Sequence, residues 1–241
     1  MLAIWKREVQ NYFLTPIGYV FMGIFLLVSG VLFFLNNIMS YSASVSTVFG
    51  NMNWPLMLGI PILTMRLLSE EKRTKSDQLL LTSPRSIWDI VLGKFLAACT
   101  VLLATMVIAL LHVLIVSVYS MEVHVGLIIS NFLGTFLLGC CYVAVGVLMS
   151  TVTESQVSAT VLALGANVML WILETVAPQL ALPSAISFLS TVFSWLSLYT
   201  KYYQFSAGVL SIANVVYYLS FCGIFLFLAV RVIDKRRWSE G

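Results

Sequence analysis

The charged side chains of this chain are gathered in a few places, with long apolar runs between them. Residues 66–94 carry a large share of the charge, although charged residues make up only 10% of the 241 positions and hydrophobic residues 60%. A soluble domain has about 25% charged residues, and an apolar run of about 20 residues can cross a bilayer as a helix. The chain is therefore predicted to be an all-α integral membrane protein, with residues 1–241 forming one transmembrane domain.

The apolar runs predict six transmembrane helices. Pro55 and Pro61 predict a bend in the second of them. With six helices and an internal N-terminus, every Lys and Arg except Lys201 lies on one side of the membrane, in agreement with the positive-inside rule. We therefore expect a multi-pass protein of the cell membrane with both termini in the cytoplasm. The predicted ranges are about 17–36, 54–69, 90–119, 126–150, the segment that follows the turn Thr151 to Gln156 and runs to about 176, and 211–231.

Two further helices are expected at the membrane surfaces. Residues 1–14 separate apolar from polar side chains at helical spacing, which predicts an N-terminal amphipathic interfacial helix. Residues 177–210 have no charge before Lys201, but a seventh span there would place Arg236 and Arg237 outside the cell. That region is therefore predicted to form an external re-entrant helix.

The charged stretch contains a short segment with helix signals at both ends. Thr74 and Asp77 have the spacing of a capping box, and Pro84 ends the helix that follows. A solvated loop that only sets membrane orientation gains nothing from the three leucines at 79–81, whereas a docking helix needs apolar anchors inside a charged rim. We interpret residues 70–85 as a cytoplasmic docking helix, with the solvated loop as the alternative.

Six motifs carry a resemblance to a known family. They are Glu70-Glu71-Lys72-Arg73, Leu79-Leu80-Leu81-Thr82-Ser83-Pro84, Ile90-Val91-Leu92-Gly93-Lys94-Phe95, Gly208-Val209, Val216-Tyr217-Tyr218-Leu219-Ser220 and Arg236-Arg237-Trp238. In these motifs the chain resembles the permease subunits of type-2 ABC exporters, including the bacterial branch linked to gliding motility and to drug or peptide export. The resemblance spans most of the chain. It implies six helices in each subunit and a dimer formed with a second copy or with a related permease.

The resemblance implies that residues 70–85 are a coupling region on which a separate ABC ATP-binding subunit docks. The chain cannot bind the phosphates itself, because its only Gly-Lys pair, Gly93-Lys94, is followed by Phe95 and does not form a phosphate-binding loop. We expect no cofactor in this chain, ATP and Mg on the partner subunit, no enzymatic activity of its own, and no nucleic acid partner. The expected coupling interface consists of Glu70, Glu71, Lys72, Arg73, Leu79, Leu80, Thr82, Ser83 and Pro84.

The resemblance also points to the second and fifth spans as the lining of a transport pathway formed within the bilayer. The pathway candidates are Met57, Asn167, Trp171 and Glu174. Each has a plainer alternative. Met57 and Trp171 can be ordinary packing residues, Asn167 can make an interhelical hydrogen bond, and Glu174 can face water at the external end of its span.

Two other function classes are alternatives to an exporter subunit, an intramembrane hydrolase and an ion-coupled secondary transporter. An intramembrane hydrolase is disfavoured, because the chain has neither Gly-x-Ser-x-Gly nor His-Glu-x-x-His. An ion-coupled secondary transporter uses ionisable groups near the midplane, for which His112, Asn167 and Glu174 are the polar candidates. The four cysteines lie in apolar runs without metal-site spacing, so no metal is expected. We predict the permease subunit of an ATP-driven exporter, with the ion-coupled transporter as the alternative.

Overall fold

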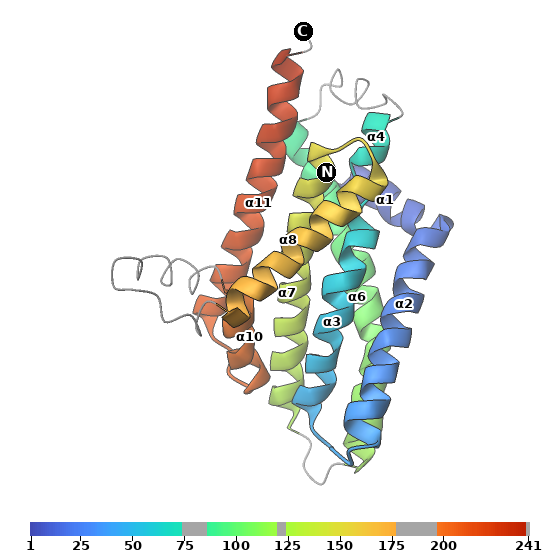
Figure 1. Ribbon diagram of the computed structural model, residues 1–241, viewed down its shortest axis with the longest axis vertical. Helices are drawn as coiled ribbons and strands as arrows, with labels where there is room; N and C mark the ends of the chain where they lie inside the picture. The colour runs from blue at the N-terminus through green and yellow to red at the C-terminus, as the bar shows by residue number, and fades with distance from the viewer. Residues whose placement is uncertain (74–85, 120–123, 177–196, 240–241) are drawn as a thin grey trace.

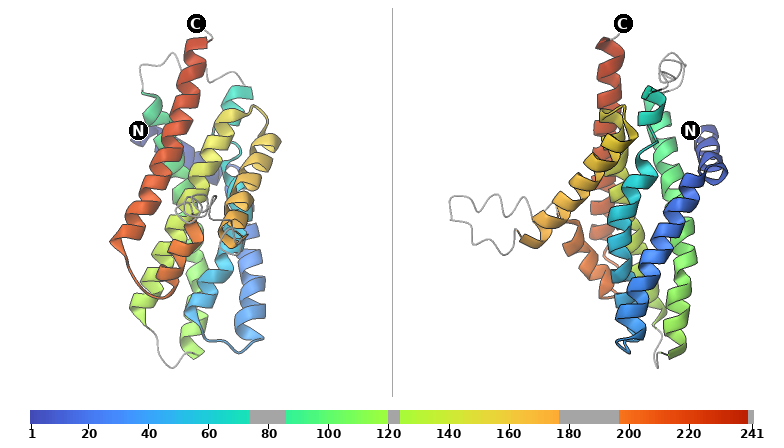
Figure 2. Two further views of the ribbon diagram at one scale, coloured as in Figure 1. Left: turned by 60° about the vertical axis from the view of Figure 1, so that its left-hand side comes forward. Right: turned by 45° about the vertical axis from the view of Figure 1, so that its right-hand side comes forward.

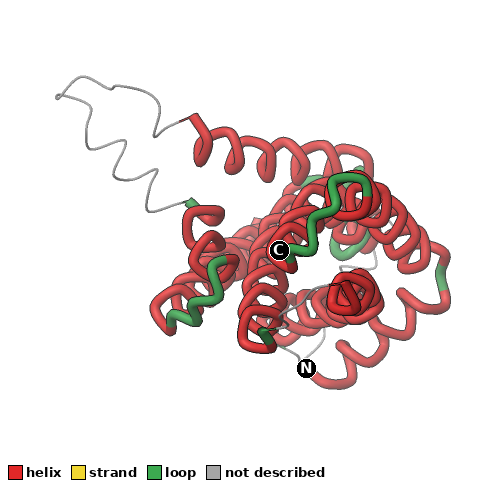
Figure 3. Tube along the Cα trace, turned by 90° about the horizontal axis from the view of Figure 1, so that it is seen from below, coloured by secondary structure: helices red, strands yellow, loops and turns green. Residues whose placement is uncertain are grey.

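The computed structural model describes residues 1–73, 86–119, 124–176 and 197–239, and the elements in these ranges are all helices (Figures 1 and 3), which confirms the all-α prediction. In chain order they are α1 (Leu2–Leu14), α2 (Pro16–Phe33), the short π-helix η1 (Phe34–Ile38), α3 (Val45–Thr64), α4 (Ser69–Arg73), α6 (Ile87–Tyr119), α7 (Val125–Val152), α8 (Gln156–Val176), α10 (Leu198–Ser206) and α11 (Ile212–Ser239).

Four of the described helices are long and apolar enough to cross a membrane. They run over Pro16–Ile38, Ile87–Val118, Val125–Val152 and Ile212–Lys235, and they match the first, third, fourth and sixth predicted spans. In the places of the second and fifth spans lie α3, which carries several polar residues, and α8, whose apolar part is shorter. The count of six spans therefore stays a prediction.

The helix α3 begins and ends earlier than the predicted span 54–69. Its start is capped by Ser44, whose hydroxyl accepts a hydrogen bond from the backbone N–H of Thr47 at 3.4 Å. The buried Asn51 donates to the carbonyl of Leu32 at 3.4 Å and to Oδ1 of Asn37 at 3.3 Å. Because η1 and the end of α2 supply these partners, uncharged polar residues that could have formed an external loop are accommodated in a packed helix.

The central helix of the bundle is α7. In its most apolar stretch 72% of the residues are buried, against 33% to 39% in the other three long helices. Three of its glycines allow different neighbours to approach closely. A Cβ atom at Gly139 would lie 2.7 Å from Cδ2 of Leu102 on α6, and one at Gly134 would lie 2.5 Å from Cβ of Phe205 on α10. At Gly146 it would collide with the side chain of Thr64 on α3. Small residues at helix contacts have this role in membrane bundles.

The helix α10 is the described part of the region predicted to be re-entrant, whose residues 177–196 lie outside the described ranges. Polar contacts fix it against the bundle. The hydroxyl of Ser130 on α7 donates to the carbonyl of Phe205 at 2.9 Å, and the phenol of Tyr218 on α11 donates to the carbonyl of Leu198 at 2.6 Å. The side chain of Tyr202 between them is buried.

Both ends of the chain lie toward the end of the bundle that carries α4 (Figures 1 and 2). The last helix continues to Ser239, past the predicted end of the sixth span at 231, so Lys235, Arg236 and Arg237 lie within the helix. At the far side α8 leans away from the other helices toward its C-terminal end (Figure 2). The four cysteines are buried and unbridged.

We expect Gly146→Ala to weaken the contact between α3 and α7. The added methyl group meets a β-branched, fully buried Thr64, and overpacking of this kind costs about 1–3 kcal/mol of unfolding free energy. Thermal unfolding in detergent can be followed with a thiol-reactive dye, because the cysteines are buried in the fold. Gly223→Ala on α11 is the matched control, since its Cβ meets nothing within 4 Å. Equal melting temperatures for the two variants would contradict this account.

Candidate functional site

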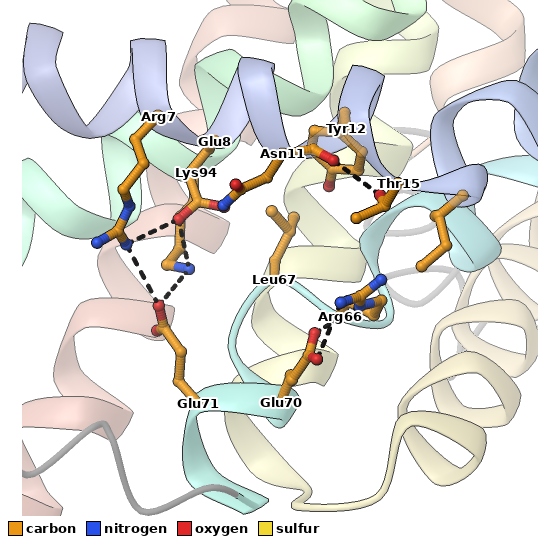
Figure 4. Close-up of a pocket in the computed structure, with 11 residues that line it drawn as sticks. Arg7, Glu8, Asn11, Tyr12, Thr15, Arg66, Leu67, Glu70, Glu71 and Lys94 are labelled. Carbon is orange, nitrogen blue, oxygen red and sulfur yellow. Dashed lines mark hydrogen bonds and ion pairs between the residues drawn. The ribbon is translucent and has the colours of Figure 1, made fainter.

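A buried lysine joins three helices at the end of the bundle that carries α4 (Figure 4). Only 2% of the Lys94 surface is exposed. Its Nζ lies 2.8 Å from a carboxylate oxygen of Glu71 on α4 and 3.4 Å from one of Glu8 on α1. The Nη2 atom of Arg7 also approaches both acids, at 3.1 Å from Glu8 and 3.9 Å from Glu71. These four side chains, here called the Lys94 cluster, link α1, α4 and α6.

The contact of α1 with α6 places Glu8 over this lysine. A Cβ atom at Gly93 would lie 3.0 Å from Cγ2 of Ile4, so the two helices come close where the cluster forms. Beside this contact, the indole N–H of Trp5 donates to the hydroxyl of Thr100 at 3.0 Å. Further along α1, the phenol of the buried Tyr12 donates to the carbonyl of Leu63 at 2.9 Å, which ties α1 to the end of α3.

The electrostatics of the cluster depend on this pairing. Burial raises the pKa of the Glu71 carboxyl above its ordinary value, while the nearby Lys94 ammonium and Arg7 act to lower it. A carboxylate and an ammonium taken out of water are tolerated when they pair with each other. Lys94 therefore pairs with two acids that come from distant parts of the sequence.

A second ion pair lies opposite the Lys94 cluster. The guanidinium of Arg66 donates two hydrogen bonds to the carboxylate of Glu70, from Nε at 2.5 Å and from Nη2 at 2.9 Å. This bidentate arrangement is the favoured geometry for an arginine and a carboxylate. Between the pair and the cluster is a pocket of about 380 Å³ (Figure 4). The pocket is lined by Arg7, Glu8, Asn11, Tyr12, Thr15, Ile17, Arg66, Leu67, Glu70, Glu71 and Lys94.

Part of the predicted coupling interface lies at this site. Glu70, Glu71, Lys72 and Arg73 form most of α4, and the carboxylates of the first two pair with the protein's own cations. Their expected contact with an ATP-binding subunit stays a prediction. The other members of the predicted interface lie outside the described residues. They are Leu79, Leu80, Thr82, Ser83 and Pro84.

Sequence reasoning missed Glu8 and Lys94 as partners. In the sequence, Lys94 stands out as part of a family motif and of a Gly-Lys pair that does not form a phosphate-binding loop, and neither assigns it a partner. One signal was available in α1, because Glu8 falls on the same helical stripe as Trp5 and Tyr12. An acid within the packed face of an amphipathic helix indicates a buried cation on the neighbouring element.

The pathway candidates lie on two packed helices. The rings of Trp54 on α3 and Trp171 on α8 have centroids 5.1 Å apart, and the hydroxyl of Thr160 lies 3.3 Å from the sulfur of Met65. The order of these two contacts along the chain shows that α3 and α8 run antiparallel. Asn167 has helical spacing from both Thr160 and Trp171, so it belongs to the face that meets α3.

Burial distinguishes these candidates. Met57 is 5% exposed and Asn167 is fully buried, whereas Trp171 is half-buried. Within the described part of the chain, neither side-chain polar atom of Asn167 has a hydrogen-bond partner, so the expected interhelical bond is not made there. Glu174 belongs to α8, but its side chain is not among those described.

Comparison with protein families places most of the chain in one of them. A family model described as "ABC-2 family transporter protein" matches residues 43–236. No curated protein matches the chain.

We expect Lys94→Met to lower the unfolding free energy by about 3 kcal/mol, the lower end for breaking a buried ion pair, because the acids keep 12% and 17% exposure. The substitution preserves the side-chain length and leaves Glu8 and Glu71 without their shared cation. Glu70→Gln is the control, because it breaks an ion pair whose members are about one-third exposed, worth about 0.5 kcal/mol. Chemical unfolding in detergent measures both. Similar losses of unfolding free energy in the two variants would show that the ion pairs of Lys94 contribute no more to stability than the partly exposed Arg66–Glu70 pair.

Proposed function

This chain belongs to the ABC-2 family of transporter proteins, and on that premise we propose that it is the membrane-spanning permease subunit of an ATP-driven exporter. The matched residues 43–236 carry the proposal. Four long apolar helices support a multi-pass membrane protein. The chain itself lacks a phosphate-binding loop, so ATP and Mg would be bound by a separate subunit.

The proposed dock for the ATP-binding subunit is the coupling region 70–85. The geometry of α4 supports this assignment, because its residues lead directly into the segment that would meet the partner. Through Glu71 this short helix is ion-paired to Lys94 on α6, and the same lysine holds Glu8 on α1. A displacement of the coupling region would therefore move the helices of the bundle as well, because ion pairs connect α4 to them.

The pathway is proposed to form between this chain and a second copy or a related permease. The surface where α3 packs against α8, which contains the Trp54–Trp171 contact, is here called the α3–α8 seam. Beside it on α3, Trp54 and Leu58 are each 47% exposed. The outer face of α8 adds further exposed apolar residues: Val161, Leu162, Met169 and Ile172. An apolar wall of this kind favours a hydrophobic or amphipathic substrate.

We expect Leu79→Asp combined with Leu80→Asp to abolish co-purification of an ATP-hydrolysing subunit while the membrane fold persists. Charged residues would replace the apolar anchors of the dock. The detergent-solubilised protein is captured and the ATPase activity of the bound material is measured. The control is Val209→Asp with Leu210→Asp, two adjacent exposed residues between α10 and α11. If the ATPase remained bound to the Leu79 and Leu80 variant, the docking helix would be excluded.

The orientation of the bundle can be tested with single introduced cysteines. Ala43→Cys between η1 and α3 and Ser155→Cys between α7 and α8 both place thiols at exposed positions. We expect an impermeant thiol reagent to label the first in intact cells and the second only after the membrane is opened. The parent protein provides a low background, because its cysteines are buried. The reverse pattern would place both termini outside.

A further inference from the structure

The pocket beneath α1 has a lining suited to a ligand that carries both charges. Its cations and carboxylates are equal in number: Arg7, Arg66 and Lys94 against Glu8, Glu70 and Glu71. A purely anionic or cationic ligand would bring an uncompensated charge into a partly buried site, which is unfavourable. We propose that this pocket binds the headgroup of a zwitterionic phospholipid, phosphatidylethanolamine, as a resident component of the protein.

The exposed charges at the rim are the groups that can reach such a headgroup. Lys94 is buried and held by two acids, so it shapes the base of the site. The side chain of Arg7 is 58% exposed, and those of Arg66 and Glu70 are 31% and 33% exposed. The lipid phosphate binds at the guanidinium groups, and its ammonium binds at the Glu70 carboxylate. Figure 4 shows Arg7 and the Arg66–Glu70 pair on opposite sides of the pocket.

The level of the pocket relative to the membrane surface indicates that the zwitterionic ligand is a lipid. Thr15 and Ile17 line it at the junction where α1 ends and the apolar helix α2 begins. On α1 itself, Leu2 is 76% and Leu14 84% exposed, so these side chains need lipid around them. A site at the start of a spanning helix and beneath a surface helix opens at the level of the headgroups. Phospholipid is the zwitterion concentrated there.

The lining discriminates between the two common zwitterionic headgroups. A primary ammonium has three N–H donors, and one of them can donate to the Glu70 carboxylate, whose two oxygens also accept from Arg66. The trimethylammonium of choline donates none and is recognised by cages of aromatic rings. Among the described residues that line the pocket, Tyr12 is the only aromatic one, and it is 6% exposed with its hydroxyl bonded to Leu63. The site therefore favours ethanolamine over choline.

Native mass spectrometry of the delipidated full-length protein tests this assignment independently of ATP or transport. The protein is titrated with phosphatidylethanolamine, phosphatidylcholine and phosphatidylglycerol of identical acyl chains. We expect about tenfold tighter binding of phosphatidylethanolamine, the effect of one hydrogen bond to a charged group. The double variant Arg66→Gln with Glu70→Gln, which keeps the net charge, should lose this preference. Glu154→Gln with Lys201→Gln makes the same charge changes elsewhere and should retain it.

Three results would overturn the proposal. Equal affinity of the parent protein for the three lipids would remove the headgroup selectivity, and an unchanged preference in the Arg66 and Glu70 double variant would place the site elsewhere. Equally tight binding of free phosphoethanolamine would assign the pocket to a soluble zwitterion. Should the double variant unfold, Arg66→Glu with Glu70→Arg keeps the ion pair but exchanges its ends, and it too should lose the preference.

Discussion

The ammonium group of Lys94 is buried near the end of the bundle, and several other contacts depend on its pairing. Removing such an ion from water costs several kcal/mol unless opposite charges lie beside it. The two acids that meet this need lie on α1 and α4, far apart in the sequence. Their pairing requires α1 to fold back onto α6 and α4 to lie at the end of α6. The close contact of Gly93 with Ile4 and the hydrogen bond of Trp5 to Thr100 lie along the same interface.

Elsewhere the bundle accommodates polar residues by giving them partners within the fold, because lipid offers none. On α3, Asn51 bonds to α2 and η1, and serine and tyrosine side chains hold the backbone of α10. These contacts allow short or polar helices to pack beside the long apolar ones. Asn167 in the α3–α8 seam is one exception, because both of its side-chain polar atoms lack partners among the described residues.

Hydrophobic length was enough to predict α6, α7 and α11, together with α2, because a long run without charge leaves few alternatives to a spanning helix. The position of α3 could not be read in the same way. Its start depends on Ser44 as a cap and on partners for Asn51 that come from another helix, and such tertiary contacts leave little local signal. The link between Glu8 and Lys94 was missed for a similar reason, since the two residues are 86 positions apart. The acidic residues of α4 were predicted to face a partner, which stays a prediction, and in the structure they pair with Arg66 and Lys94 of the same chain.

The arrangement of α4 bears on how a movement of the coupling region would spread in the proposed exporter. Glu70 pairs with Arg66, just after α3, whereas Glu71 pairs with Lys94 on α6. Adjacent carboxylates on one short helix thus connect it to the turn that follows α3 and to the helix α6. A shift of α4 that pulls on Arg66 acts on α3, whose seam with α8 contains the unpartnered Asn167. A buried amide without a partner costs about 1–3 kcal/mol, so an arrangement of α3 and α8 that supplies one is favoured by that amount. A movement between these two helices that gave Asn167 a hydrogen-bond partner would therefore recover this cost.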